Sequence, residues 1–165
     1  MKAPTLENEY VKLALLDLSN YRKLITIAQQ ENIVQYLPSK IDTSEDLKDY
    51  VQTAVNGYYH KTAIPFIIFN KTKNIYAGCT RFMNIDWKNK VLEIGATWIG
   101  REFQGSGLNK NMKFLMLQYA FETLNFQKVE FRIDERNTRS RKAVEKIGAT
   151  LEGILKKKCV FIRWF

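Results

Sequence analysis

The sequence has few of the residues on which common metal and nucleophile sites depend. Its 165 residues include one histidine and two cysteines. His60 lies in the polar run Tyr-Tyr-His-Lys, which is typical of a helix end, so we expect no His-dependent triad. Cys79 and Cys159 have no metal-ligand spacing, and a lone pair of cysteines is a poor disulfide framework. We therefore expect no metal site and two reduced cysteines.

Long apolar runs are also missing. No segment approaches the roughly 20 apolar residues that cross a bilayer, and no apolar run follows a basic start at the N-terminus. The sequence therefore predicts a cytoplasmic protein with no membrane partner. At 165 residues, of which 45% are apolar, the chain is expected to form a single domain, 1–165, with a substantial core.

The first half of the chain has one strand pattern, two helix patterns and then several short strands. Apolar residues alternate with others over 9–16, as in a half-buried strand. Helical spacing follows over 18–31 and 43–60, and Thr43 or Ser44 can cap the second helix. From Ile64 to Ile99 short apolar runs are separated by polar breaks, which indicates an antiparallel meander.

The second half adds helices that are separated by a strand. A strongly periodic helix begins at Leu108, and its methionines are expected to fill the core. Val129, Phe131 and Ile133 alternate as in a strand, and a last helix begins at an Asn137 cap and is ended by Gly148. This order of elements predicts an α+β or mixed α/β fold.

A glycine-rich turn, Gln104-Gly-Ser-Gly-Leu-Asn-Lys110, joins the last strand of the meander to the helix at Leu108. Glycines let the backbone approach a ligand, and the N–H groups of the first helical turn can then bind phosphate oxygens. Two glycines after a strand equally suit a tight structural connection. The turn lacks the Gly-Lys-Ser/Thr ending of a P-loop and the three-glycine spacing of a dinucleotide fold, so neither nucleotide class is favoured.

Residues 128–148, a strand followed by an Asn-led helix and a glycine stop, resemble the Gcn5-related N-acetyltransferase (GNAT) superfamily, and most closely its RimJ/RimL-type ribosomal-protein N-terminal acetyltransferases. In that family Gln/Arg-x-x-Gly-x-Gly/Ala holds the pyrophosphate of acetyl-CoA, and this chain has Gln104-x-x-Gly107-x-Asn109. Asn109 departs from the pattern, so altered contacts with the cofactor are expected. The resemblance covers residues 7–155. It implies an acyl-CoA N-acyltransferase fold, in which a mostly antiparallel sheet is flanked by helices and splayed where the cofactor enters.

The resemblance also implies acetyl-CoA as the co-substrate. Backbone N–H groups near Thr97 to Ile99 would bind the pantetheine arm and polarise the thioester carbonyl, as the oxyanion that forms in acyl transfer requires. The residues expected to contact the cofactor are Thr97, Trp98, Ile99, Gln104, Gly105, Ser106, Gly107, Leu108, Asn109, Lys110, Asn137 and Ser140.

Glu93 is the expected general base, because the resembled enzymes often carry a carboxylate at this place that draws protons through water. A regular strand puts Glu93 on the same face as Thr97, about 13 Å away, so a water relay would be needed unless a bulge bends the strand. The alternative is a strand carboxylate paired with a nearby arginine or lysine.

Ser140 is the expected acid for the leaving thiolate. Helical spacing puts it on one stripe with Val144 and Ile147. Many acetyltransferases have a tyrosine at the position of Val144, and RimL-type enzymes instead have a serine at the position of Ser140. The alternative is a serine that only bonds the backbone of its first turn. The RimL-type glutamate is replaced here by Cys159.

Two functions of different classes follow from these residues. The first is an N-acetyltransferase that acts on a protein N-terminal α-amine or a small-molecule amine. The second is a non-catalytic module that senses acetyl-CoA or binds RNA, and the missing tyrosine and glutamate favour it. By family position the acceptor pocket would be lined by Tyr36, Phe66, Arg81 and Trp87, although aromatic residues are more often core.

The net charge of +9 could attract RNA, ribosomes or acidic proteins. Only residues 139–142 and 156–158 are dense in lysine and arginine, and each suits a solvated face or a strand end. Basic side chains of the first cluster could also reach the phosphates of CoA. We therefore do not expect nucleic acid to be the main partner.

The C-terminal tail is shorter than the resembled fold requires. If a sixth strand covers about 149–157, what remains is too short for a turn and a full seventh strand. Val160, Ile162 and Trp164 alternate with Phe161 and Phe165, so both faces carry apolar residues, which suits a buried strand. We predict a homodimer through this tail. The alternative is a monomer with a truncated sheet.

Overall fold

The structure is a computed structural model that describes residues 3–37 and 41–155. The chain forms two compact units, residues 1–132 and residues 133–165, and each is described here by itself. Whether residues 1–165 act as one domain stays a prediction.

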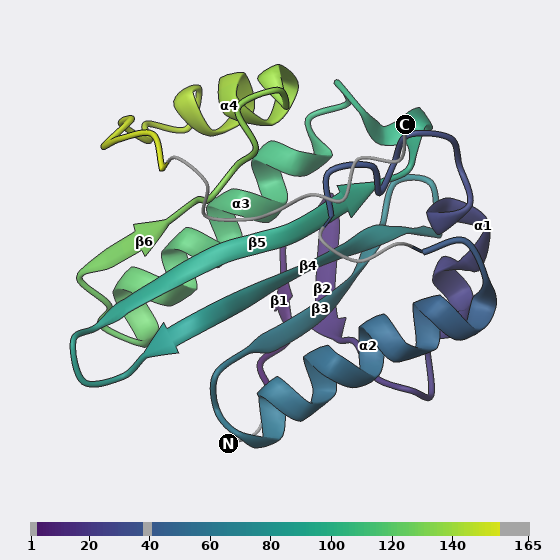
Figure 1. The fold of residues 1–165 in the computed structure, drawn as a ribbon, viewed down its shortest axis with the longest axis horizontal. Helices are drawn as coiled ribbons and strands as arrows, with labels where there is room; N and C mark the ends of the chain where they lie inside the picture. The colour runs from purple at the N-terminus through teal and green to yellow at the C-terminus, as the bar shows by residue number, and fades with distance from the viewer. Residues whose placement is uncertain (1–2, 38–40, 156–165) are drawn as a thin grey trace. The chain divides into compact units, whose positions relative to one another are not determined.

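The first unit is built on a six-stranded mixed sheet with the order β1-β2-β3-β4-β5-β6 (Figure 1). All neighbouring strands are antiparallel except β5 and β6, which are parallel. The strands are β1 (Leu6–Glu7), β2 (Val11–Leu15), β3 (Ile64–Asn70), β4 (Ile75–Asp86), β5 (Val91–Ile99) and β6 (Lys128–Glu130). The predicted α/β class and the meander β3-β4-β5 are therefore confirmed.

The helices of this unit are less regular than their sequence patterns. They are the 3-10 turn η1 (Tyr21–Leu24), α1 (Ile25–Ala28), α2 (Ser44–Tyr59), the 3-10 turn η2 (Arg101–Phe103), α3 (Leu108–Gln118) and the π-helical turn η3 (Tyr119–Thr123). The helix predicted over 18–31 was wrong in extent. The Asn20 side chain accepts from the backbone N–H of Asp17, which makes a turn before η1, and Asn32 has φ 61°, which ends the helical path. Of the two predicted caps of α2, Thr43 and Ser44, the structure has Thr43, which forms a reciprocal capping box with Asp46.

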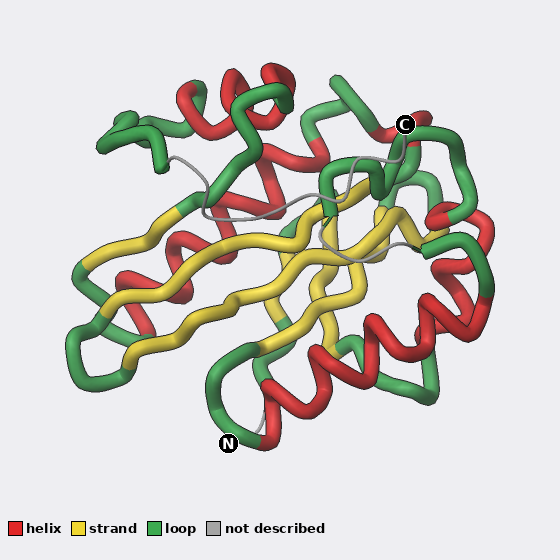
Figure 2. Tube along the Cα trace, viewed as in Figure 1, coloured by secondary structure: helices red, strands yellow, loops and turns green. Residues whose placement is uncertain are grey.

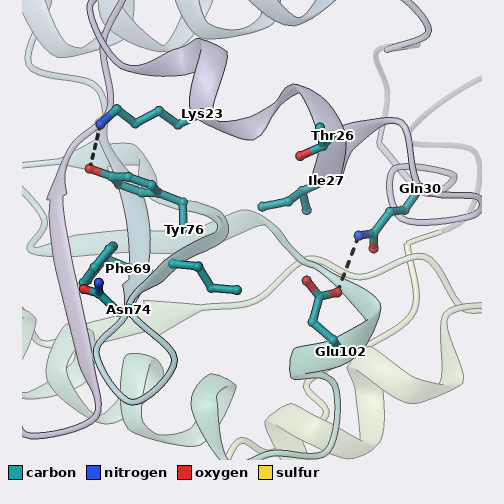
Figure 3. Close-up of a pocket in the computed structure, with 9 residues that line it drawn as sticks. Lys23, Thr26, Ile27, Gln30, Phe69, Asn74, Tyr76 and Glu102 are labelled. Atoms are coloured by element: carbon teal, nitrogen blue, oxygen red, sulfur yellow. Dashed lines mark hydrogen bonds between the residues drawn. The ribbon is translucent and has the colours of Figure 1, made fainter.

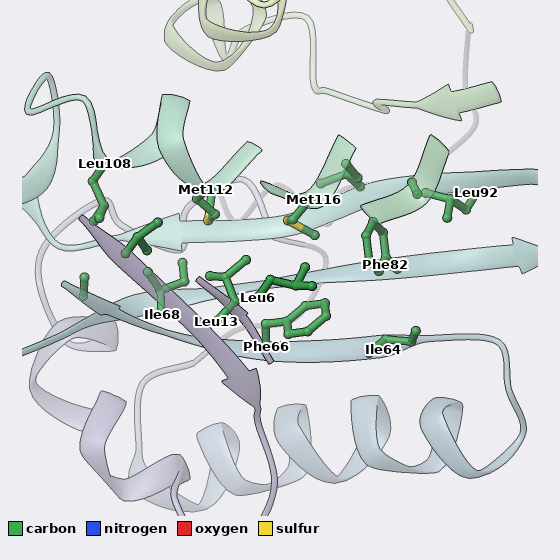
Figure 4. Packing of buried hydrophobic residues seen from close by; sticks show 14 of the residues in the cluster. Leu6, Leu13, Ile64, Phe66, Ile68, Phe82, Leu92, Leu108, Met112 and Met116 are labelled. Atoms are coloured by element: carbon green, nitrogen blue, oxygen red, sulfur yellow. The ribbon is translucent and has the colours of Figure 1, made fainter. Parts of the chain in front are cut away.

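Helices cover both faces of the sheet, and each interface is a separate core (Figure 2). On the α3 face, Met112 and Met116 are fully buried against strand residues such as Phe82 (Figure 4). On the other face, α1 and α2 pack against β3, β4 and β5 through residues such as Ile27 and Val51. The methionines of α3 are thus core residues, as predicted. The two cores hold β5 in place between them.

The second unit contains α4 (Thr138–Glu145). The Asn137 side chain accepts from the backbone N–H of Ser140 at 3.1 Å, so the predicted cap is confirmed. Gly148 has φ 95°, and the backbone N–H of Ala149 donates to the Val144 carbonyl at 3.1 Å, which closes the helix as predicted.

Two strand predictions at this end of the chain are corrected. β6 stops at Glu130 and does not continue to Ile133. Residues 149–155, where a sixth strand was expected, contain no strand. The remaining tail, 156–165, on which the homodimer prediction rests, lies outside the described residues.

Candidate active site

A β-bulge interrupts β5 near its end. The strand carries two residues, Ala96 and Thr97, opposite the single residue Thr80 of β4. Ala96 has φ 49°, a left-handed conformation that costs a non-glycine residue about 1–2 kcal/mol. The Ala96 carbonyl accepts from the Tyr50 hydroxyl at 3.4 Å, which ties the bulge to α2. Strain of this kind persists only where neighbouring contacts hold it, and it often marks a functional site.

The bulge changes which side chains share a face of the sheet. Ile94 packs in the core with α3, and the hydroxyl of Thr97 accepts from Lys113 of α3 at 2.8 Å. Residues three apart point to opposite faces in a regular strand, so only the bulge lets both face α3. Glu93 therefore lies on the face opposite to Thr97. The prediction that Glu93 and Thr97 share a face was wrong for this reason.

Beyond the bulge, one edge of β5 is open. β6 pairs with β5 only through Val91, Leu92 and Glu93 (Figure 1). From Ile94 to Ile99, the edge that faces away from β4 has no strand partner among the described residues. This is the splayed edge that the resemblance implied. Its backbone polar groups can bind an extended polar chain in the way that an added strand does.

The glycine-rich turn follows directly, after the short η2 turn that the sequence did not indicate. Gly105 and Gly107 have φ 78° and 85°, and no atom lies within 4 Å of a Cβ placed on either. Gly107 is the N-cap of α3 and provides no side-chain cap. The backbone N–H groups of Asn109 and Lys110 have no acceptor in the described part of the chain. The positive end of an 11-residue helix is therefore open, and it fits phosphate groups.

The side chains of the turn contribute less than its backbone. The Ser106 hydroxyl donates to the Phe103 carbonyl at 2.6 Å and is used locally. The Gln104 amide reaches the Ile99 carbonyl only at 3.5 Å, and Leu108 is buried in the core. A phosphate at this turn would be bound mainly by backbone N–H groups, with Lys110 exposed beside them.

Lys113 is a buried lysine that sequence reasoning missed. It is 4% exposed, and its Nζ donates to Thr97 and lies 5.5 Å from the centre of the Phe131 ring. Burial lowers the pKa of its amine from 10.5 to about 7. The signal was available, because Lys113 stands three residues before Met116 on the buried stripe of α3.

Glu93 is 5% exposed on the opposite face, and its carboxylate is engaged. It accepts from the Asn84 amide at 2.7 Å and forms an ion pair with the Nε of Arg132 at 3.6 Å. Arg132 also pairs with Glu130 at 3.1 Å. The pairing that was the alternative interpretation of Glu93 is thus present, and an acceptor amine would have to share this carboxylate.

The residues expected to line the acceptor pocket are not brought together. Phe66 is 0% exposed and packs edge-on to Phe82 in the α3 core, so it presents no surface to an acceptor. Trp87 lies in the β4–β5 connection, about 20 Å along β5 from Thr97, and its indole N–H donates to the Lys61 carbonyl at 2.7 Å. Tyr36 lies in the turn segment after α1. Only Arg81 lies next to the bulge, opposite Gly95.

Asn137 and Ser140 belong to the second unit. There Ser140 is half-buried, and its backbone N–H is bound by the Asn137 cap. Their predicted contacts with the cofactor stay a prediction.

A cavity of about 380 Å³ lies elsewhere, between α1 and the turn that joins β3 to β4 (Figure 3). Lys23 donates to the Tyr76 hydroxyl at 3.3 Å at one side of it, and Gln30 donates to Glu102 at 3.5 Å at the other. None of the predicted site residues lines it. Its wall includes Glu102 of η2, which lies in the connection between β5 and the glycine-rich turn.

Comparison with known families agrees with this geometry. The family described as "Acetyltransferase (GNAT) domain" matches residues 11–150. The chain belongs to the GNAT acetyltransferases. The predicted activity class, an acetyl-CoA-dependent N-acetyltransferase, is therefore confirmed.

Individual GNAT proteins extend the comparison. YdaF of Bacillus subtilis, whose name assigns it provisionally to the ribosomal N-acetyltransferases, is 27% identical over 158 residues, which are 88% of this chain and 81% of YdaF. A GCN5-related N-acetyltransferase from Brucella melitensis superposes with a TM-score of 0.88 at 24% identity, covering 97% of this chain and 73% of that one. Spermidine N-acetyltransferase from Vibrio cholerae, solved with CoA and spermine, has a TM-score of 0.72 at 18% identity and covers 88% and 84%. The GNAT family and fold are confirmed, and the name of YdaF agrees with the predicted RimJ/RimL-type branch.

No helix in the described part of the chain is long and apolar enough to cross a membrane. Among the same residues, no three or more His, Cys, Asp and Glu side chains are grouped so that they could hold a metal ion.

Proposed function

We propose that this GNAT protein transfers the acetyl group of acetyl-CoA directly to a primary amine, which is either a protein N-terminal α-amine or an amine of a small molecule. The observation that supports it most is the open N-terminus of α3, which follows an unpaired strand edge in the same unit. The first feature suits the pyrophosphate of CoA and the second suits its pantetheine arm.

Acetyl-CoA supplies an activated acetyl group: the neutral amine attacks the thioester carbonyl carbon, the C–S bond breaks, and the CoA thiolate takes up a proton. The backbone N–H groups at the end of β5 would hold the carbonyl oxygen as it gains charge. Because the bulge fixes this segment from two sides, through Tyr50 and through Lys113, little reorganisation is needed during the reaction.

Glu93 would accept the proton that the amine loses, through a water molecule. Its side chain lies on the face of the sheet that packs against α1 and α2. Thr97 and Lys113 lie on the opposite face. Its ion pair with Arg132 holds the carboxylate in one orientation. Ser140 would supply the proton for the thiolate, which the resemblance to RimL-type enzymes supports.

The alternative is a module that binds acetyl-CoA without turnover. Val144 and Cys159 favour it, since they replace the tyrosine and glutamate that related enzymes use. Release of free thiol with a panel of peptide, amino-acid and polyamine acceptors, measured beside acetyl-CoA binding by calorimetry, separates the two. Thiol release that depends on an acceptor supports the enzyme, whereas binding without release on every acceptor supports the module.

A further inference from the structure

Arg81 is a buried arginine whose charge is not neutralised. It is 9% exposed, and its guanidinium carbon lies 4.5 Å from the centre of the Tyr50 ring. It makes no ion pair among the described residues. A cation–π contact offsets only part of the cost of removing a guanidinium from water. An arginine cannot lose its proton at any ordinary pH, so the charge persists.

None of the carboxylates in the described part of the chain forms an ion pair with Arg81. Glu93, on the neighbouring strand, is paired with Arg132. The undescribed residues 1–2, 38–40 and 156–165 contain no aspartate or glutamate. A carboxylate of a bound molecule can therefore supply the compensating charge.

A buried hydrogen-bond donor without an acceptor lies close by. The indole Nε1 of Trp98 is buried and has no hydrogen-bond acceptor among the described residues. The Trp98 ring is 6.4 Å from the Tyr50 ring, so Tyr50 is flanked by both donors. Both groups donate only, and a carboxylate, which only accepts, satisfies such a pair.

The position of Arg81 connects it with the reaction. It pairs across the strands with Gly95, and the Met83 sulfur would lie 2.7 Å from a Cβ placed on this glycine. A Cβ placed on Gly95 would lie 3.0 Å from a carboxylate oxygen of Glu93, so Arg81 and Glu93 flank Gly95 on one face. Strand geometry puts the Cα atoms of Arg81 and Glu93 about 8 Å apart. The bulge begins at the next residue, Ala96.

We propose that the acceptor amine belongs to a molecule with a carboxylate a few atoms away, which Arg81 binds while the amine lies toward Glu93 and the end of β5. This inference rests on the proposed acetyl transfer and adds the chemical class of the acceptor. A free amino acid and a peptide with an acidic N-terminal residue both carry this group. A polyamine does not, and its positive charges would be repelled by Arg81.

The first experiment uses the unchanged protein and matched pairs of acceptors. Thiol release is measured with free amino acids against their amides, with peptides that begin with Asp or Glu against Asn or Gln, and with spermidine. In one of the two kinds of pair, amino acid against amide or acidic against amide N-terminal residue, we expect kcat/KM to be about 10- to 100-fold higher for the acceptor with the carboxylate. A charge-assisted hydrogen bond in a desolvated site contributes that much. The kind of pair that shows the preference tells whether the acceptor is a free amino acid or a peptide with an acidic N-terminal residue.

The second experiment uses Arg81→Met, with Arg22→Met as the matched control, because Arg22 also lies over a tyrosine ring, at 6.0 Å, but is exposed. Arg81→Met should raise KM for the carboxylate acceptor about 10- to 100-fold and remove the preference over its amide. Its affinity for acetyl-CoA should not change. Arg81→Lys should recover part of the preference, and Arg22→Met should match the unchanged protein.

The outcomes separate this inference from the proposed function. Turnover that is equal for acids and amides, or highest for spermidine, overturns the acceptor class and leaves acetyl transfer standing. Absence of turnover with every acceptor overturns acetyl transfer. In that case calorimetry with the same amino acids and amides in the presence of CoA decides: carboxylate binding that Arg81→Met abolishes supports the inference, and absence of such binding overturns it.

Discussion

Replacing Lys113 with methionine should stabilise the protein, although the lysine makes a hydrogen bond. Lys113 is 4% exposed, and burial lowers the pKa of its amine from 10.5 to about 7. At low pH, where the amine is charged in the folded and the unfolded protein, its burial therefore lowers the free energy of unfolding by about 5 kcal/mol. The hydrogen bond to Thr97 contributes about 1 kcal/mol. Methionine has nearly the same length and no charge. We therefore expect Lys113→Met to raise the free energy of unfolding by about 4 kcal/mol near pH 6.

The pH dependence identifies the cause. Between pH values of about 7 and 10.5, the unfolded chain keeps a proton on Lys113 that the folded protein has lost. The stability of the unchanged protein therefore rises with pH in this window, by about 1.4 kcal/mol per unit relative to the variant. The advantage of Lys113→Met should be constant below about pH 6.5 and should shrink by about 3 kcal/mol between pH 7.5 and 9.5.

The measurement is urea unfolding of both proteins at a series of pH values, with Lys110→Met as the control. Lys110 lies in the same helix but is exposed, so its replacement should change stability by less than about 0.5 kcal/mol at every pH. A variant that is less stable than the unchanged protein at pH 6, or an advantage that does not vary with pH, would refute the reasoning.

Three further predictions concern the site itself. Gly107→Asn should lower acetyl-CoA affinity by at least about 10-fold in calorimetry, because the asparagine side chain occupies the space of the phosphate. It should change stability by about 1 kcal/mol or less, because asparagine tolerates the left-handed φ. The control Gly148→Asn, at a glycine with a similar φ of 95° and open surroundings, should keep normal affinity. Glu93→Gln should shift the pH–rate profile toward higher pH, where the acceptor amine is already neutral, and an unshifted profile would exclude Glu93 as the base. Ser140→Ala should lower kcat about 10-fold or more with little change in acetyl-CoA affinity, and an unchanged kcat would leave Ser140 as a helix-start residue.

The sequence predicted the elements whose signal is local. The Thr43 capping box, the Asn137 cap and the Gly148 stop each depend on a few adjacent residues, and the structure has all three. The glycine-rich turn was also readable, since Gly105 and Gly107 occupy backbone conformations that other residues rarely adopt. The helix expected over 18–31 failed because polar side chains before it form a competing turn, which helical spacing does not reveal.

The bulge could not be read from the sequence, because its left-handed residue is an alanine. An alanine at φ 49° has no sequence signal, and its conformation is held by contacts from α2 and α3 that are distant along the chain. The error about Glu93 follows from it, since every side chain before the bulge changes face relative to those after it. The placement of Phe66 in the acceptor pocket failed for a different reason. It assigned aromatic residues by position, whereas Phe66 is fully enclosed by the core.

Two buried cations, one on each face of β5, show how the same physical problem is solved in two ways. Lys113 can lose its proton, so its burial is tolerated at a cost that falls as pH rises. Arg81 cannot, and its cost is reduced only by a contact with Tyr50 or by an anion from outside. A lysine therefore suits the α3 face, where no charged ligand is needed beside it. An arginine suits the opposite face, where we propose that a carboxylate binds. In Arg81→Lys, the amine at position 81 should lose its proton when no acceptor molecule is bound. Binding of a carboxylate should then be coupled to the uptake of a proton by this amine. Calorimetry in buffers of different ionisation enthalpy detects such proton uptake.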